Sequence, residues 1–152
     1  QQPLLERLGR GDRQRMDRLV REQLARELTA VRDKINDART RAYGRGAREQ
    51  ALDLKPVEKR ADTLRQAAET QAHGPAAYLA GAAITHKQLA AMLGYDEELL
   101  ARSAAVGDQA EGLRQTVLSG GDVATAAQQL ETALSALDHQ FQARSRFMQA
   151  GE

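Results

Sequence analysis

The chain has 152 residues, with 22 Lys/Arg against 21 Asp/Glu and neither Cys nor Trp. That length suits one domain, over residues 1–152, with a hydrophobic core of its own. The absence of Cys excludes disulfides, thiolate metal sites and cysteine nucleophiles. Good helix formers (Ala, Leu, Gln, Arg and Glu) dominate, and long β-branched runs are absent. The composition therefore predicts an all-α protein.

The near-neutral total charge hides a split between the two halves of the chain. Residues 1–65 carry 17 Lys/Arg and 11 Asp/Glu, whereas residues 66–152 carry 5 and 10. A chain polarised in this way either folds its basic half against its acidic half or presents a charged face to a partner. The sequence leaves both interpretations open.

The first long helix is predicted from about residue 12 to residue 43, with Asp12 as its N-cap. Residues 1–11 precede it as a short segment that is frayed or docks separately. Apolar residues recur along this helix with heptad spacing and form a seam on one face, as in coiled coils. At 1.5 Å per residue the helix would be about 48 Å long, too long for its neighbours to cover, so we expect self-association. The residues of this self-association seam are Leu24, Leu28, Val31 and Ile35.

A Gly-Arg-Gly sequence at 44–46 ends this helix, because glycine tolerates the left-handed conformation that follows a helix C-terminus. A second helical segment is predicted over about 47–72, and Pro56 lies inside it. Proline removes a helical hydrogen bond. Either the helix kinks there, or a short helix ends near Leu54 and a new one starts with Pro56 in its first turn. We favour the restart.

His-Gly-Pro at 73–75 stops the second segment. A third, almost uncharged segment is predicted over about 76–93, and its low charge favours burial on most sides. Thr85 and Gln88 have the spacing of a capping box, so this segment is expected to break near Thr85. Gly94 is expected to close it.

Asp96 is predicted to be the N-cap of a fourth helix over about 97–118, and Asp122 that of a last helix over about 123–149. Ser-Gly-Gly at 119–121 separates the two. Short loops between helices enforce antiparallel neighbours. The sequence therefore predicts an antiparallel up-and-down bundle of four to five helices with a long, coiled-coil-like N-terminal helix.

The sequence contains no recognisable catalytic, cofactor or metal-binding motif. Its histidines, His73, His86 and His139, lack the Glu three residues earlier that di-iron bundles require, and no His-Glu-x-x-His zinc motif occurs. A Walker-type phosphate loop and a Gly-x-Ser-x-Gly nucleophile elbow are also absent. We therefore predict a non-enzymatic protein with no cofactor, no metal and no small-molecule ligand.

The Arg-rich first helix is the strongest candidate for binding a partner. Its arginines could form a basic ridge for nucleic-acid phosphates or an anionic membrane surface. They could equally be a solvated face held by local pairs such as Asp17 with Arg21, or meet acids of a neighbouring helix. A base-stacking platform is unsupported, because Tyr43 is the only aromatic of this helix. The candidate residues for nucleic acid or another anionic partner are Arg7, Arg10, Arg13, Arg15, Arg18, Arg21, Arg32 and Arg39.

The leading functional hypothesis is an interaction or scaffold module that binds a protein partner, or itself as a homodimer, through its heptad-patterned helix faces. A nucleic-acid-binding helical protein using the Arg-rich N-terminal helix is the first alternative, and a membrane-surface-associated amphipathic protein is the second. The Arg-to-Lys ratio of 18 to 4 suggests a bacterial source. No stretch has the ~20 apolar residues of a membrane span and no signal peptide is visible, which favours the cytoplasm.

Overall fold

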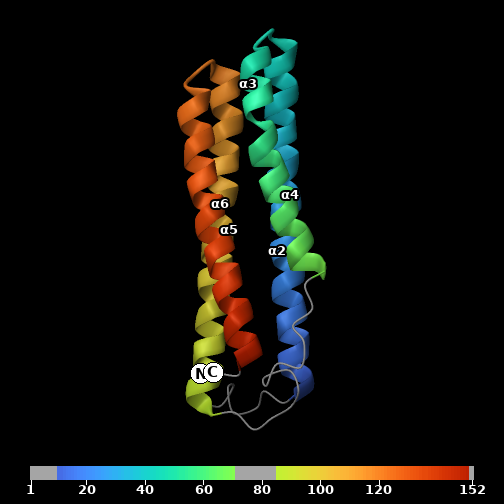
Figure 1. Cartoon of the computed structure of the whole chain (residues 1–152), viewed down its shortest axis with the longest axis vertical. Helices are drawn as coiled ribbons and strands as arrows, with labels where there is room; N and C mark the ends of the chain where they lie inside the picture. Colours follow the sequence, from blue (N-terminus) through green and yellow to red (C-terminus); the bar gives the residue numbers. More distant parts are fainter. Residues whose placement is uncertain (1–9, 71–84, 151–152) are drawn as a thin grey trace.

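The computed structural model describes residues 10–70 and 85–150, and every regular element within these ranges is an α-helix (Figure 1). The predicted all-α helical bundle is confirmed. The first described helix has 35 residues and is about 52 Å long at 1.5 Å per residue, so the long N-terminal helix is confirmed as well. In chain order the helices are α2 (Arg10–Gly44), α3 (Arg48–Asp53), α4 (Lys55–Thr70), α5 (His86–Ser119) and α6 (Val123–Ala150).

The helices form two antiparallel hairpins that pack side by side. In one hairpin α2 pairs with α3 and α4, and in the other α5 pairs with α6 (Figure 1). Between the hairpins, α2 packs along α5 and α4 along α6, so the helices that meet there run in the same direction. The ion pairs Lys34–Glu111 and Asp37–Arg114 follow this parallel register of α2 and α5. The predicted antiparallel order therefore holds within each hairpin, and parallel neighbours meet between them.

The N-terminal boundary of the first helix differs from the prediction. α2 starts at Arg10, so Asp12 lies within the first turn and is not the N-cap. The helix includes Gly11 because a glycine costs only about 1 kcal/mol of helix propensity. The predicted glycine turn at the other end is confirmed: Gly46 has a φ of +80°, and the backbone N–H of Ala47 donates to the Ala42 carbonyl at 2.9 Å.

The predicted restart at Pro56 is confirmed. α3 ends at Asp53, Leu54 is its C-cap, and α4 starts at Lys55 with Pro56 as its second residue. The first backbone N–H groups of a helix have no intrahelical partner, so proline loses no hydrogen bond there. Leu54 is fully buried, which anchors the junction between the two helices in the core.

The predicted break at Gly94 is wrong, because α5 continues through this residue without interruption. A Cβ at Gly94 would contact nothing, and a mid-helix glycine costs only about 1 kcal/mol. Met92 and Leu99 are buried on either side of it and hold the helix against the bundle. Asp96 is therefore not an N-cap but an interior residue of α5, and its side chain is buried.

The predicted capping box at the start of α5 is confirmed. The Gln88 backbone N–H donates to the Thr85 hydroxyl oxygen at 3.1 Å, and the Thr85 backbone N–H donates to the Gln88 side-chain oxygen at 2.9 Å. Both bonds satisfy donors that the helix leaves unpaired at its start. The remainder of the third predicted segment, together with His73, lies outside the described residues.

We expect Thr85→Ala to lower the free energy of unfolding by about 1 kcal/mol, because the change removes the side-chain acceptor of the cap. Thr132→Ala is the matched control. Thr132 is exposed in α6 and its hydroxyl donates to the carbonyl of Gln128 in its own helix, so alanine should be neutral or stabilising there. Urea denaturation of both variants measures the difference, and equal effects would contradict the capping role.

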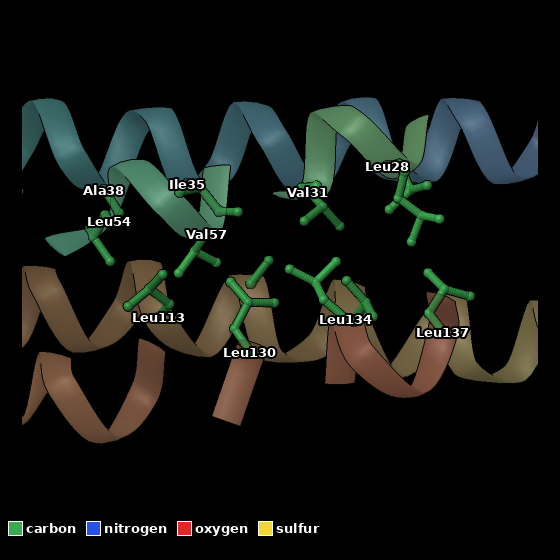
Figure 2. Close-up of a cluster of buried hydrophobic side chains, with 14 of the residues drawn as sticks. Leu28, Val31, Ile35, Ala38, Leu54, Val57, Leu113, Leu130, Leu134 and Leu137 are labelled. Atoms are coloured by element: carbon green, nitrogen blue, oxygen red, sulfur yellow. The ribbon is translucent and has the colours of Figure 1, made fainter. Parts of the chain in front are cut away.

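The main core lies between the two hairpins and is built chiefly from leucine, alanine and valine side chains. Figure 2 shows side chains of α2, such as Leu28 and Ile35, pointing toward those of the second hairpin, such as Leu130. The four residues of the predicted self-association seam belong to this core, and none is more than 2% exposed. The seam is therefore covered within a single chain. Those four residues are Leu24, Leu28, Val31 and Ile35.

A second, smaller core lies near the start of α5 and the end of α6. Leu89, Met92 and Met148 are buried in it. The ring of Tyr95 stacks on that of Phe147 beside it, with centroids 4.7 Å apart. This cluster extends the packing of α5 against α6 beyond the last turn of α4.

Candidate functional site

The structure separates the arginines of the predicted basic ridge. Arg32 pairs with Asp62 of α4, and Arg39 pairs with Glu58 of α4, each at 2.9 Å. Both arginines therefore fasten α2 to its hairpin partner. Arg18 is exposed and makes no ion pair with the described residues. The three arginines do not form one open basic face.

Of the remaining candidate arginines, Arg13, Arg15 and Arg21 have described side chains, and their surroundings differ. Arg21 donates to the Asp17 carboxylate at 3.0 Å, which is the predicted local pair. Arg13 is only 6% exposed, whereas Arg15 is exposed. Arg7 lies outside the described residues, and the side chain of Arg10 does too. Among the described residues of the predicted anionic-partner site, solvent therefore reaches only some of the arginines.

Ion pairs between the hairpins account for part of the charge split. The basic α2–α4 hairpin and the acidic α5–α6 hairpin meet where α2 packs along α5 and where α4 packs along α6. Opposite charges lie within pairing distance there. Exposed pairs of this kind contribute about 0–1 kcal/mol each. The surface pairs that follow the split are Lys34–Glu111 and Arg60–Glu131. A third pair, Asp37–Arg114, has the opposite polarity.

A buried ionic cluster joins the three helices α2, α5 and α6. The Arg144 guanidinium of α6 is fully buried and donates to Asp96 of α5 at 2.6 Å and to Asp17 of α2 at 2.8 Å. The two carboxylates are also buried, with 8% and 4% of their side chains exposed. Asp17 accepts a second bond from Arg21. Arg144 thus links α6 directly to α2, whose backbones do not pack together.

The Asp96 carboxyl group of this cluster has a raised pKa. Burial raises the pKa of Asp96 above its ordinary value, the charge and hydrogen bond of Arg144 oppose that rise, and the negative charge of Asp17 adds to it. Burial also opposes the charge on Arg144, but the two carboxylates together outweigh burial and raise the pKa of the guanidinium. Asp96 therefore takes up a proton more readily in acid than an ordinary aspartate does.

The raised pKa of Asp96 predicts a pH effect of definite sign. The folded protein binds a proton at Asp96 at a higher pH than the unfolded chain does. The resulting stabilisation is present below the ordinary pKa of 3.8 and is lost as pH rises through the raised value. The free energy of unfolding of the wild type should therefore increase relative to Asp96→Asn as pH falls from about 7 to about 4.

Urea titrations of both proteins across this range measure the relative change. Other carboxylates act in the opposite direction: hydrogen bonds from Arg114 and Gln115 lower the pKa of Glu111 to about 2. Because Glu111 is present in both proteins, its contribution cancels in the comparison. A difference that stays constant with pH, or that falls in acid, would contradict the raised pKa.

A shallow basic pocket of about 520 Å³ lies on the surface of the first hairpin. Arg18, Arg21 and Arg26 of α2 line it, and the last turn of α4 forms one side. Two carboxylates, Glu22 and Glu69, line it as well. The mixed lining weakens the attraction of this pocket for an anion, because each carboxylate repels the ligand that the arginines attract.

A groove of about 450 Å³ lies between α4 and α6. These two helices form one contact between the hairpins, and α2 and α5 form another. Its floor is apolar: Leu64 and Leu134 are buried and Ala67 is partly buried. It extends along α4 from Pro56 to Ala67, which is about 16 Å or three helical turns. Such a volume falls in the ~300–1,000 Å³ range of protein binding pockets.

The two rims of this groove carry opposite charges. Lys59 and Arg60 line it from α4, and Asp138 lines it from α6. Arg60 bridges the helices through bonds to Glu131 at 2.7 Å and Ser135 at 2.8 Å, the only polar link between α4 and α6 among the described residues. Lys59 and Asp138 make no ion pair with the described residues. These two charges are therefore available to a ligand in the groove.

The described part of the chain holds no cluster of side chains suited to a metal ion. His86 and His139 are exposed and lie on different helices, and no three potential ligands among His, Cys, Asp and Glu gather there. None of the described helices combines the length and the apolar character needed to cross a membrane. Comparison of the chain with protein-family models, curated proteins and solved structures finds no match.

Proposed function

We propose that this chain is a non-enzymatic helical interaction module that receives an amphipathic helix of a protein partner in the α4–α6 groove. The observation that carries the proposal is the apolar floor of this groove, formed by Leu64, Ala67 and Leu134 between two helices that run in parallel. Amphipathic helices bind proteins by laying their apolar face into such grooves.

The dimensions of the groove favour a helix over a compact small molecule. The groove is about three helical turns long, and its walls are the surfaces of two helices. A third helix placed against such a pair inserts its side chains between the rows of the other two. The opposite charges at the rims, Lys59 and Asp138, favour a partner helix that carries both signs of charge.

A designed helical peptide tests the proposal. We would use about 18 residues with Leu at i, i+3, i+4 and i+7 and with Gln on both flanks, following the spacing of one helical face. Fluorescence anisotropy measures its binding to the wild type, and NMR shift perturbations locate it. We expect the perturbed amides to lie on α4 and α6.

Two variants block the groove and one matched variant leaves it open. Ala67→Arg places a long side chain on the floor, and Thr63→Arg places one at the exposed rim, where it cannot disturb the core. Ala104→Arg adds the same side chain at an exposed position of α5. Binding should be lost in the first two variants and retained in the third. Equal binding by all three would refute the groove as the docking site.

The proposal also commits to a separate partner rather than a second copy of the chain. Sedimentation equilibrium of the protein alone should therefore give the monomer mass. A concentration-dependent dimer that Thr63→Arg abolishes would overturn the choice of occupant, because the groove would then hold a second copy.

A further inference from the structure

The α4–α6 groove has charged residues at its rims as well as an apolar floor. Resting on the proposed function above, we propose that the bound helix carries an acidic residue on the flank facing α4 and a basic residue on the flank facing α6, about six residues apart along its axis. The inference comes from Lys59 and Asp138 and from the relative register of the two helices that carry them.

The bonds of Arg60 give the register. Arg60 contacts both Glu131 and Ser135, so it lies level with the α6 turn between them. Because α4 and α6 run in the same direction, Lys59 lies level with about residue 132 of α6. Asp138 is then about six residues further along the axis, which is about 9 Å. The groove therefore has a positive wall at one end and a negative wall at the other.

The other charged residue that lines the groove does not cancel this polarity. Arg60, the other cation of the α4 rim, is already bonded to Glu131, whereas Lys59 is exposed and has no partner among the described residues. On the α6 rim, Asp138 is partly buried and equally unpaired within the described residues, and the adjacent lining residue Gln142 is neutral. A bound helix with complementary charges would place its acidic residue within ion-pair distance of Lys59 and its basic residue within ion-pair distance of Asp138. The apolar floor beside these pairs limits the screening of their attraction by water and salt.

Three peptides on the same Leu-faced scaffold test the inference. They differ only at one position on each flank, six residues apart, and carry Glu/Lys, Lys/Lys or Glu/Glu there. The Glu/Lys peptide can bind in either direction along the groove, so it can take the direction that places its Glu near Lys59 and its Lys near Asp138. The comparison therefore does not depend on which flank position carries the Glu. Binding is measured by fluorescence anisotropy at low salt. The wild type should bind the Glu/Lys peptide about two- to fivefold more tightly than either of the others, as expected for exposed ion pairs.

Charge reversal in the protein should change the preferred peptide. Lys59→Glu gives the groove two acids, so the Lys/Lys peptide should become the tightest ligand. Asp138→Lys gives it two bases, so the Glu/Glu peptide should bind best. Lys87→Glu and Asp108→Lys make the same changes of net charge at exposed positions of α5 and should leave the wild-type order intact. Circular dichroism checks that each variant keeps its helical fold.

The outcomes separate this inference from the proposed function. If all three peptides bind the wild type equally well and compete with the uncharged peptide, the groove is a docking site without charge selection, and only this inference is overturned. If none of them binds, the proposed function is overturned too. If the α5 control variants change the order as strongly as the groove variants, the selectivity comes from net charge, and the inference is again overturned.

Discussion

Replacing Arg144 by methionine is expected to lower the free energy of unfolding by about 3–5 kcal/mol. The change removes the one guanidinium that both Asp96 and Asp17 bond inside the bundle. Asp17 keeps its bond from Arg21, but Asp96 is left as an uncompensated buried charge. Urea denaturation monitored by circular dichroism measures the loss. A loss below about 1 kcal/mol would contradict the importance of the cluster.

The matched control and the rescue follow from the same physics. Arg102→Met removes a guanidinium from the surface of α5, where the pair with Glu98 is exposed, and should cost about 1 kcal/mol at most. The triple variant Arg144→Met, Asp17→Leu and Asp96→Leu should recover most of the lost stability, because it removes the buried carboxylates together with their partner. Failure of this rescue would mean that Arg144 stabilises the fold by packing and not by its charge.

Leu28→Ala is expected to lower the free energy of unfolding by about 2–5 kcal/mol at every protein concentration. Leu28 is fully buried within the single chain, so its truncation leaves a cavity in the core between the hairpins. Had this residue formed a contact between two chains, the loss would shrink on dilution as the contact dissociates. Urea denaturation at two protein concentrations that differ about hundredfold distinguishes the two cases.

Leu19→Ala provides the comparison for this prediction. Leu19 lies on the same helix but is 54% exposed, so its truncation should change stability by less than about 0.5 kcal/mol. A loss for Leu28→Ala that depends on concentration would restore the self-association seam that the first helix predicts.

The features that could be predicted from the sequence are those with a local cause. The heptad spacing of Leu24, Leu28 and Val31 identifies the buried face of α2, because side chains three and four residues apart share one face of a helix. The restart at Pro56 and the cap at Thr85 depend on the backbone chemistry of a few neighbouring residues. Each of these predictions needs no knowledge of the distant parts of the chain.

The features that could not be predicted depend on which helices become neighbours. Asp96 has the local signature of an N-cap, and only its bond to Arg144, 48 residues away, explains its burial. The partners of Arg32 and Arg39 on α4 follow from hairpin packing in the same way. The α4–α6 groove depends on the parallel approach of two helices that are not adjacent in the chain. A basic residue such as Lys59 gives no signal of this in the sequence, because an exposed lysine is the ordinary state of a helix surface.

The pairing of one basic hairpin with one acidic hairpin gives the folded molecule an electric dipole across its width. Residues 10–70 hold 16 Lys/Arg against 11 Asp/Glu, whereas residues 85–150 hold 5 against 8. Each hairpin extends along the length of the bundle (Figure 1). The electric field that an approaching molecule meets is therefore positive on one long side of the bundle and negative on the other, rather than differing between its two ends. A charged partner would thus be turned toward one side of the bundle before any contact forms, and salt would slow that encounter more than it would shorten the life of the complex.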